Sequence, residues 1–193
     1  MHAALRAILF LTATIAAFGQ AAELSFGGGE NIIGGGDIGS GYSLSGGYRI
    51  QFATTLNPWR FMGYEFGYAY NRMELYYTDP LTGIKTDEGG MAGHQGFFRF
   101  LGYAVPEGKR IRPFASGGIH FTNFVPPGSS VTSGGGNTKF GVNYGVGIKF
   151  LILPNWLIRL DARQYLTGKP FGLPGASGNL RQNEYSISLA FAL

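Results

Sequence analysis

Residues 184–193 read EYSISLAFAL, a run in which large apolar side chains alternate with small or polar ones. One set of positions holds Tyr185, Ile187, Leu189, Phe191 and Leu193. The other set holds Glu184, Ser186, Ser188, Ala190 and Ala192. Successive side chains of a strand point to opposite faces, so this period of two predicts a β-strand with one apolar face.

The same alternation recurs through the chain upstream of this run. It is clear in residues 140–150, FGVNYGVGIKF, and in residues 156–166, WLIRLDARQYL. It is noisier in residues 42–52, where Tyr42, Leu44, Tyr48, Ile50 and Phe52 share the apolar face. Further strands are expected at residues 62–71, around 95–100, at 111–122 and at 24–33. Together these segments predict eight strands.

The contrast between the two faces decides how these strands are arranged. The apolar face is large and aromatic, whereas the opposite face is mostly Gly, Ser and Ala with a few charges. An eight-stranded barrel encloses little volume, so small residues suit its interior, and segments of about 11 residues can cross a bilayer at a tilt. We therefore expect an all-β, eight-stranded antiparallel up-and-down transmembrane β-barrel. A soluble lipocalin-like carrier, with the apolar face inside, is the alternative.

Composition and connection lengths favour the membrane barrel. The chain has 33 Gly in 193 residues, and charged residues make up only 13%, against about 25% in soluble domains. Short turns at residues 56–59, 106–109 and 153–156 alternate with longer polar loops at 78–90, 126–137 and 168–183. Outer-membrane barrels alternate short and long connections in this way. Trp59 and Trp156 follow two of the short turns and are expected to be aromatic anchors at one membrane interface.

The first residues predict export. Arg6 precedes an apolar stretch at residues 7–18, and small residues follow it, which is the pattern of a secretory signal peptide. We expect a signal peptide at residues 1–21 and a barrel domain at residues 22–193. The chain has no Cys, and its net charge of +4 comes from scattered basic residues. No nucleic-acid partner is expected, because no long basic run is present.

Three stretches resemble a known family. They are Arg112-Pro113-Phe114, residues 139–147 (KFGVNYGVG) and residues 155–163 (NWLIRLDAR). With the alternation around them, the chain resembles the eight-stranded bacterial outer-membrane β-barrel family of outer-membrane-protein-A-like and opacity-protein-like barrels. The resemblance implies location in the cell outer membrane of a Gram-negative-type bacterium. Barrels of this family usually end in an aromatic residue that the insertion machinery recognises, whereas this chain ends in Leu193.

Charged residues on the small-residue face are expected to form an interior network. Its expected members are Arg49, Glu65, Arg99, Arg159, Asp161, Arg163 and Glu184, and Arg112 and Lys149 share their phase. Isolated charges need partners in a narrow lumen, so we interpret the set as a salt-bridge plug. An ion path through a small pore is the alternative.

No catalytic, cofactor-binding or metal site is expected. Gly34, Gly36 and Gly39 match a dinucleotide fingerprint in spacing, but an alternating strand follows where a helix is required. His94 and His120 have no second ligand at metal-binding spacing. Lipid A deacylases of this architecture carry a His-x-Ser pair near the end of the penultimate strand, and the corresponding residues here, 164–167, read QYLT.

The sequence thus predicts a non-catalytic integral outer-membrane barrel with a structural or surface-interaction role. The expected partners are outer-membrane lipid, the barrel-insertion machinery during assembly, and a surface ligand bound through the outer loops; the barrel is expected to be a monomer. Residues 169–172, KPFG, mix basic and apolar character, which suits an anionic lipid headgroup or a host surface. An outer-leaflet lipid (lipid A) acyl hydrolase and a small pore remain as alternatives.

Overall fold

The computed structural model describes residues 21–130 and 136–193, and the expected signal peptide lies outside them except for Ala21. The strands are β1 (Ala21–Gly34), β2 (Asp37–Gly39), β3 (Tyr42–Ser45), β4 (Gly47–Trp59), β5 (Met62–Thr78), β6 (Lys85–Tyr103), β7 (Ile111–Val125), β8 (Asn137–Leu153), β9 (Trp156–Gly168) and β10 (Asn179–Ala192). No helix long and apolar enough to cross a membrane occurs in these two ranges.

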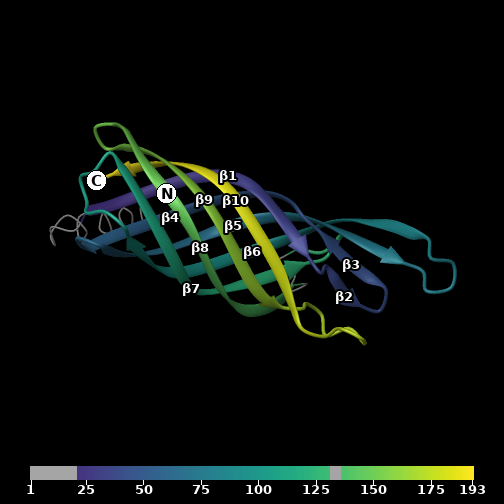
Figure 1. Ribbon diagram of the computed structural model, residues 1–193. Coiled ribbons are helices and arrows are strands. Elements are labelled where there is room, and N and C mark those ends of the chain that lie inside the picture. The colour runs from purple at the N-terminus through teal and green to yellow at the C-terminus, as the bar shows by residue number, and fades with distance from the viewer. Residues whose placement is uncertain (1–20, 131–135) are drawn as a thin grey trace, which may run out of the picture.

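Eight of these strands close into an antiparallel barrel (Figure 1). Neighbours in sequence pair from β4 through to β10, and β1 joins the two ends by pairing with both β4 and β10. Gly28, for example, lies opposite Ile50 on one side and Ile187 on the other. The expected eight-stranded up-and-down barrel is confirmed within the described part of the chain.

The large apolar side chains lie on the outside of this barrel. Val146, Ile119 and Phe140 are exposed by 59%, 63% and 79%. The charged residues of the other face are buried; Arg49, Glu65 and Arg163 are examples. An apolar exterior around a charged interior is the arrangement of a barrel in lipid. It excludes the soluble carrier, in which the apolar side chains would fill the interior.

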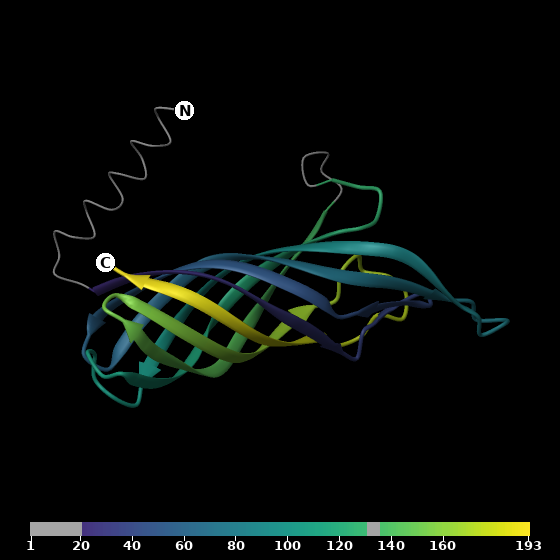
Figure 2. The same cartoon turned by 90° about the horizontal axis from the view of Figure 1, so that it is seen from above.

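The two ends of the barrel differ. The β4–β5, β6–β7 and β8–β9 connections lie at one end together with the C-terminus, and we call this the short-turn end (Figure 2). The opposite, long-loop end carries β2, β3 and the β7–β8 and β9–β10 connections. The β5–β6 hairpin projects furthest at that end in both views. Residues 78–90 were expected to be a loop, but residues 85–90 belong to β6 and pair with β5.

The expected strand at residues 42–52 is divided at Gly46. The register against β5 shifts by one residue between Ser45 and Arg49. A Cβ at Gly46 would lie 1.9 Å from the carbonyl oxygen of Asn31, so a larger residue does not fit there. A shift of one residue exchanges the faces of a strand. Leu44 was therefore assigned to the wrong face: it is 4% exposed and packs at the barrel mouth.

Candidate functional site

The lumen at the short-turn end is closed by an ion pair between opposite walls. Lys149 on β8 is ion-paired with Glu23 on β1, and its ammonium also donates to the Tyr103 hydroxyl at 2.9 Å. Asn57 donates to the second oxygen of Glu23 at 2.9 Å and accepts from Tyr103 at 2.8 Å. All four side chains are buried, so they form a polar layer across the lumen.

Glu65 is the first centre of the network above this layer. Its carboxylate is ion-paired with Arg159 from the far wall and lies 3.2 Å from Nε of Arg99 on the adjacent strand. The hydroxyl of Thr55 donates to Glu65 at 2.8 Å. Glu65 is 1% exposed, so these contacts replace the water that a carboxylate would otherwise bind.

Asp161 and Glu184 connect the remaining arginines. Asp161 lies between Arg159, at 2.8 Å, and Arg163 on its own strand. Arg163 then reaches Glu184 on β10 at 3.0 Å. Residues i, i+2 and i+4 of a strand share one face, which places the three β9 side chains in a single row. An acidic residue between two basic ones lowers their mutual repulsion.

Arg49 completes the network toward the long-loop end. Its Nε lies 3.3 Å from Glu184, and its Nη1 donates to Asn71 at 2.9 Å and to Gln95 at 2.7 Å. The Tyr165 ring lies 5.0 Å from the guanidinium carbon, and its hydroxyl donates to Glu184 at 2.7 Å. The structure thus brings all seven sequence-predicted network residues into one connected cluster.

Two of the interior residues described above, Glu23 and Tyr103, were not identified from the sequence. They lie at strand ends that the alternation did not reach. Tyr165 shares the inner face of residues 156–166 with Arg159, Asp161 and Arg163, as the alternation predicts, but its contacts with Arg49 and Glu184 were not predicted. Arg112 is buried on the inner face, as expected, but it lies at the short-turn end and outside the central network. It donates to the carbonyls of Val105 and Arg60, and its guanidinium carbon lies 3.3 Å from the Tyr103 ring centre.

The long-loop end is closed by apolar side chains, which we call the mouth cluster. Its buried members come from six strands and are Ile38, Leu44, Met73, Leu75, Met91, Phe124 and Leu180. Tyr42, Phe171 and Leu173 pack against the cluster and, with Ile38, Leu75 and Pro126, line a pocket of about 310 Å³. Strands and connections that are far apart in the sequence thus form one apolar pocket at the long-loop end.

His120 forms a contact in the lumen that resembles the histidine and hydroxyl of a catalytic pair. Its Nε2 is 2.7 Å from the hydroxyl of Thr167, and its ring packs edge-on against Tyr165. The other ring nitrogen, Nδ1, has no partner among the described residues. A catalytic pair needs a third group that orients the base and a route for substrate. His120 and Thr167 are both buried, and the mouth cluster lies between them and the long-loop end. The pair therefore lacks the substrate route that catalysis needs.

His94 lies on the outer wall, where its Nδ1 is 2.5 Å from the hydroxyl of Tyr68. No group of three or more potential metal ligands occurs in the described residues. Gly36 precedes β2 and Gly39 is its last residue, so both belong to the small β2–β3 hairpin at the barrel mouth, a context different from the strand and helix that a dinucleotide site requires.

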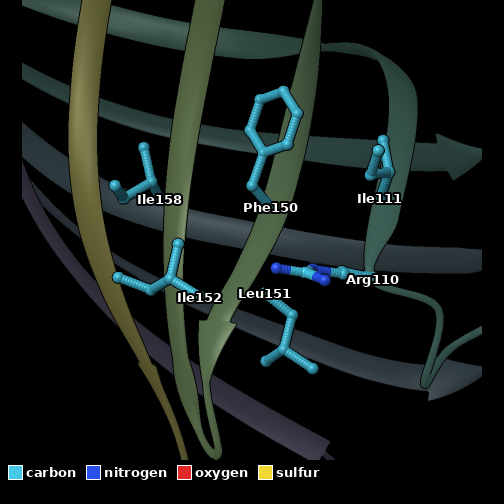
Figure 3. A pocket seen from close by; sticks show the side chains of 6 residues that line it. All are labelled: Arg110, Ile111, Phe150, Leu151, Ile152 and Ile158. Atoms are coloured by element: carbon cyan, nitrogen blue, oxygen red, sulfur yellow. The ribbon is translucent and has the colours of Figure 1, made fainter.

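The two tryptophans lie at the short-turn end on the outer surface. Trp59 ends β4 and is 57% exposed, whereas Trp156 begins β9 and packs edge-on against Phe191. A shallow hollow of about 310 Å³ lies near the same end between β7, β8 and β9 (Figure 3). Ile111, Phe150, Ile158 and Arg110 are among the residues that line it. The aromatic rings of Trp59, Trp156 and Phe150 and the cation of Arg110 therefore all lie near the short-turn end of the outer surface.

The comparisons with known proteins agree with this architecture. The family described as the outer membrane protein β-barrel domain matches residues 4–192, and the chain belongs to that family. Its members are bacterial outer-membrane barrels. A comparison with curated proteins finds no match.

Solved structures support the fold. OprG from Pseudomonas aeruginosa superposes with a TM-score of 0.62 at 12% identity, over 90% of this chain and 97% of that chain. Neisserial surface protein A gives a TM-score of 0.57 at 13% identity, over 89% and 96% of the two chains. The E. coli outer membrane protein W gives 0.52 at 18% identity, over 91% and 100%. At these identities the likeness concerns the fold alone.

Proposed function

We propose that this protein is a non-catalytic, sealed barrel of the outer membrane that has a structural role and presents a binding surface at its long-loop end. The observation that carries the proposal is the filled lumen. An ionic network crosses its centre, a polar layer lies at the short-turn end, and the mouth cluster lies at the other. An eight-stranded barrel has just enough room for such side chains, so no water path is left for ions.

The orientation follows from the connections. Outer-membrane barrels have short periplasmic turns and longer outer loops, so the long-loop end faces outward. The signal peptide at residues 1–21 supplies export, and the insertion machinery and membrane lipid are the expected partners, with the barrel acting as a monomer. The surface ligand is expected at the pocket beside Phe171 and Leu173, because its side chains are apolar and come from β2, β3, β5 and two of the long connections.

Planar-bilayer recordings test the sealed barrel. We expect no conductance steps from the folded wild-type protein, with a reconstituted porin as the positive control. Regular ohmic steps from pure, folded protein would instead establish the small pore.

Epitope insertion tests the orientation. A tag at Thr82, in the β5–β6 turn, should bind antibody on intact cells, whereas a tag at Gly108, in the β6–β7 turn, should bind only after permeabilisation. The reverse pattern would place the long-loop end in the periplasm.

The lipid hydrolase is tested separately. His120 and Thr167 are the only histidine and hydroxyl that lie within hydrogen-bond distance of each other in the described lumen, and both are buried. We expect no labelling of the folded barrel by a hydroxyl-reactive fluorophosphonate. Labelling that disappears in Thr167→Val would establish the hydrolase.

A further inference from the structure

The polar layer at the short-turn end contains a second buried cation beside Lys149. Arg112 and Lys149 are paired in register on β7 and β8, and both side chains are buried. Glu23 is the buried carboxylate of this layer, and it is ion-paired with Lys149. Because arginine stays charged in proteins, the layer keeps one positive charge that Glu23 does not neutralise.

This excess charge belongs to Arg112. Among the described residues it is the only buried arginine that has no carboxylate within ion-pair distance. The buried arginines that do have one are Arg49, Arg99, Arg159 and Arg163. The Nε and Nη2 atoms of Arg112 donate to backbone carbonyls, Nη1 has no hydrogen-bond partner in the described chain, and Tyr103 covers the guanidinium. Since all these contacts are neutral groups, the charge of Arg112 still lacks a counter-charge.

Arg112 also borders a pocket of about 260 Å³ at the short-turn end. The β6–β7 turn lines this pocket with residues 107–109, and the β8–β9 turn lines it with residues 154–155. Its apolar lining includes Leu151, Leu157 and Ala192. The one buried arginine without a carboxylate therefore stands at the wall of a small cavity, most of whose other side chains are apolar or belong to turns.

The other charges of this pocket favour an anion. Lys109 is an exposed cation on its wall, and no carboxylate of the described residues lies within ion-pair distance of it. Glu23 also borders the pocket but already pairs with Lys149. Glu107 is exposed and forms no ion pair in the described structure. The pocket thus offers two cations, Arg112 and Lys109, against one free carboxylate.

We propose that this pocket binds a small aliphatic monocarboxylate, whose carboxylate pairs with Arg112 and Lys109 and whose hydrocarbon tail packs on Leu151 and Leu157. Arginine and carboxylate form strong, charge-assisted hydrogen bonds, and one negative charge matches the one uncompensated cation. A water molecule would satisfy Nη1 but would leave the charge uncompensated. A cavity smaller than about 300 Å³ limits the ligand to a short chain. The site lies at the end opposite the proposed binding surface and does not depend on it.

The first experiment measures binding with butyrate as the probe. Butyrate labelled with ¹³C at its carboxyl carbon is titrated into the folded protein in a neutral maltoside detergent, and the line width of the labelled carbon is followed by NMR. We expect saturable binding with a Kd of about 1 mM, the order that so small a ligand reaches. Unlabelled butyrate should displace the probe. Butan-1-ol and butylammonium, which have the same chain without the carboxylate, should not.

Absence of saturable binding at ten times that concentration overturns the proposal. Displacement by butan-1-ol as effective as that by butyrate also overturns it, because the chain alone would then account for binding.

Variants of the two turn charges locate the site. Lys109→Gln should weaken butyrate binding about threefold, the effect of losing one exposed charge pair. Glu107→Gln should strengthen it by a similar factor, since it removes a carboxylate that competes for the same cations. Arg110→Gln is the matched control, because Arg110 is the next cation along the chain but lines the outer hollow. Equal weakening by Lys109→Gln and Arg110→Gln would show unspecific attraction to the basic turn and would overturn the site.

Arg112→Gln tests the buried cation itself and should abolish binding. Because Arg112 also holds the carbonyls of Val105 and Arg60, folding of this variant is checked by the heat-modifiable gel shift. A folded Arg112→Gln barrel that binds butyrate like the wild type overturns the proposal. If the variant does not fold, the opposite effects expected for Lys109→Gln and Glu107→Gln decide, and an unchanged Kd in both overturns it.

Discussion

Lys149 and Glu23 are ion-paired although two strands, β9 and β10, lie between their own strands. The pair therefore spans the lumen and does not follow the wall. Neither side chain is exposed by more than 5%, so each charge depends on the other for compensation.

This dependence predicts strong coupling between the two residues. Glu23→Gln should lower the free energy of unfolding by about 3–5 kcal/mol, because it leaves the Lys149 ammonium buried without a counter-charge. Adding Lys149→Met should recover much of that loss. Urea unfolding of the single and double variants measures the coupling. If the losses in unfolding free energy of the two single variants simply add in the double variant, water and not Glu23 stabilises the Lys149 ammonium.

Asp161→Ala should destabilise the barrel by a similar amount, about 3–5 kcal/mol, since it leaves Arg159 and Arg163 facing each other. Asp87→Ala is the matched control, because Asp87 is exposed on the β5–β6 hairpin and accepts a hydrogen bond from the Gly89 amide of the same hairpin. Unfolding midpoints of the two variants should differ clearly. Similar midpoints would mean that Asp161 is solvated and would favour an open pore.

Val146→Arg should impair membrane insertion. Val146 is 59% exposed on the apolar exterior, where an arginine near the bilayer midplane costs about 2–4 kcal/mol. Ile84→Arg is the control, because Ile84 is 64% exposed but lies in the β5–β6 turn. Folding into lipid vesicles, followed by the heat-modifiable gel shift, measures both. Normal insertion of Val146→Arg would contradict the lipid-facing assignment.

Protease should cut the folded barrel at its long-loop connections. Closed ladders leave no strand edge free, so cleavage should fall in residues 79–84 and 169–178. Mass spectrometry of the fragments identifies the sites. Prompt cleavage inside residues 140–150 of the folded protein would argue against the closed barrel.

The β5–β6 turn should respond to acid. The Leu81 amide, followed by the Thr82 hydroxyl, donates to Asp79 and holds the pKa of that carboxyl below its usual range. Because the folded-state pKa is lowered, the turn is stabilised above the unfolded-state pKa and loses this contribution as pH falls through the folded-state pKa. NMR titration of the Leu81 amide should follow that transition, and Asp79→Ala should abolish it.

The strands and their faces could be predicted because alternation is a local property. The clean runs at residues 140–150 and 184–193 kept their assigned faces throughout. Leu44 could not be assigned correctly, since the one-residue register shift at Gly46 depends on how closely β1 approaches. The phase of a strand also says nothing about which charges meet. Glu65 and Arg159 are separated by 93 intervening positions, and only barrel closure brings them together.

The mouth cluster was missed for a related reason. Met73, Met91 and Leu180 point inward near the ends of their strands. In the middle of the same strands, the inward-pointing side chains are polar. The interior is polar in the middle of the barrel and apolar at the long-loop end, so the rule of polar inside and apolar outside fails there. The position of each residue along the barrel axis depends on the register of all the strands, which the sequence alone does not give.

The ionic network also bears on how the barrel assembles. The pair between Arg49 on β4 and Glu184 on β10 straddles β1, whose pairing with β10 joins the first and last strands. In a sheet that is still open between β1 and β10, these two residues lie near opposite edges, and Glu184 keeps Arg163 of the neighbouring β9 as a partner. Arg49 meets its carboxylate only when β1 pairs with β10, so the final step of closure also removes the water around Arg49. A barrel with an open seam would therefore leave Arg49 without its counter-charge, and this couples completion of the cylinder to an all-or-none transition.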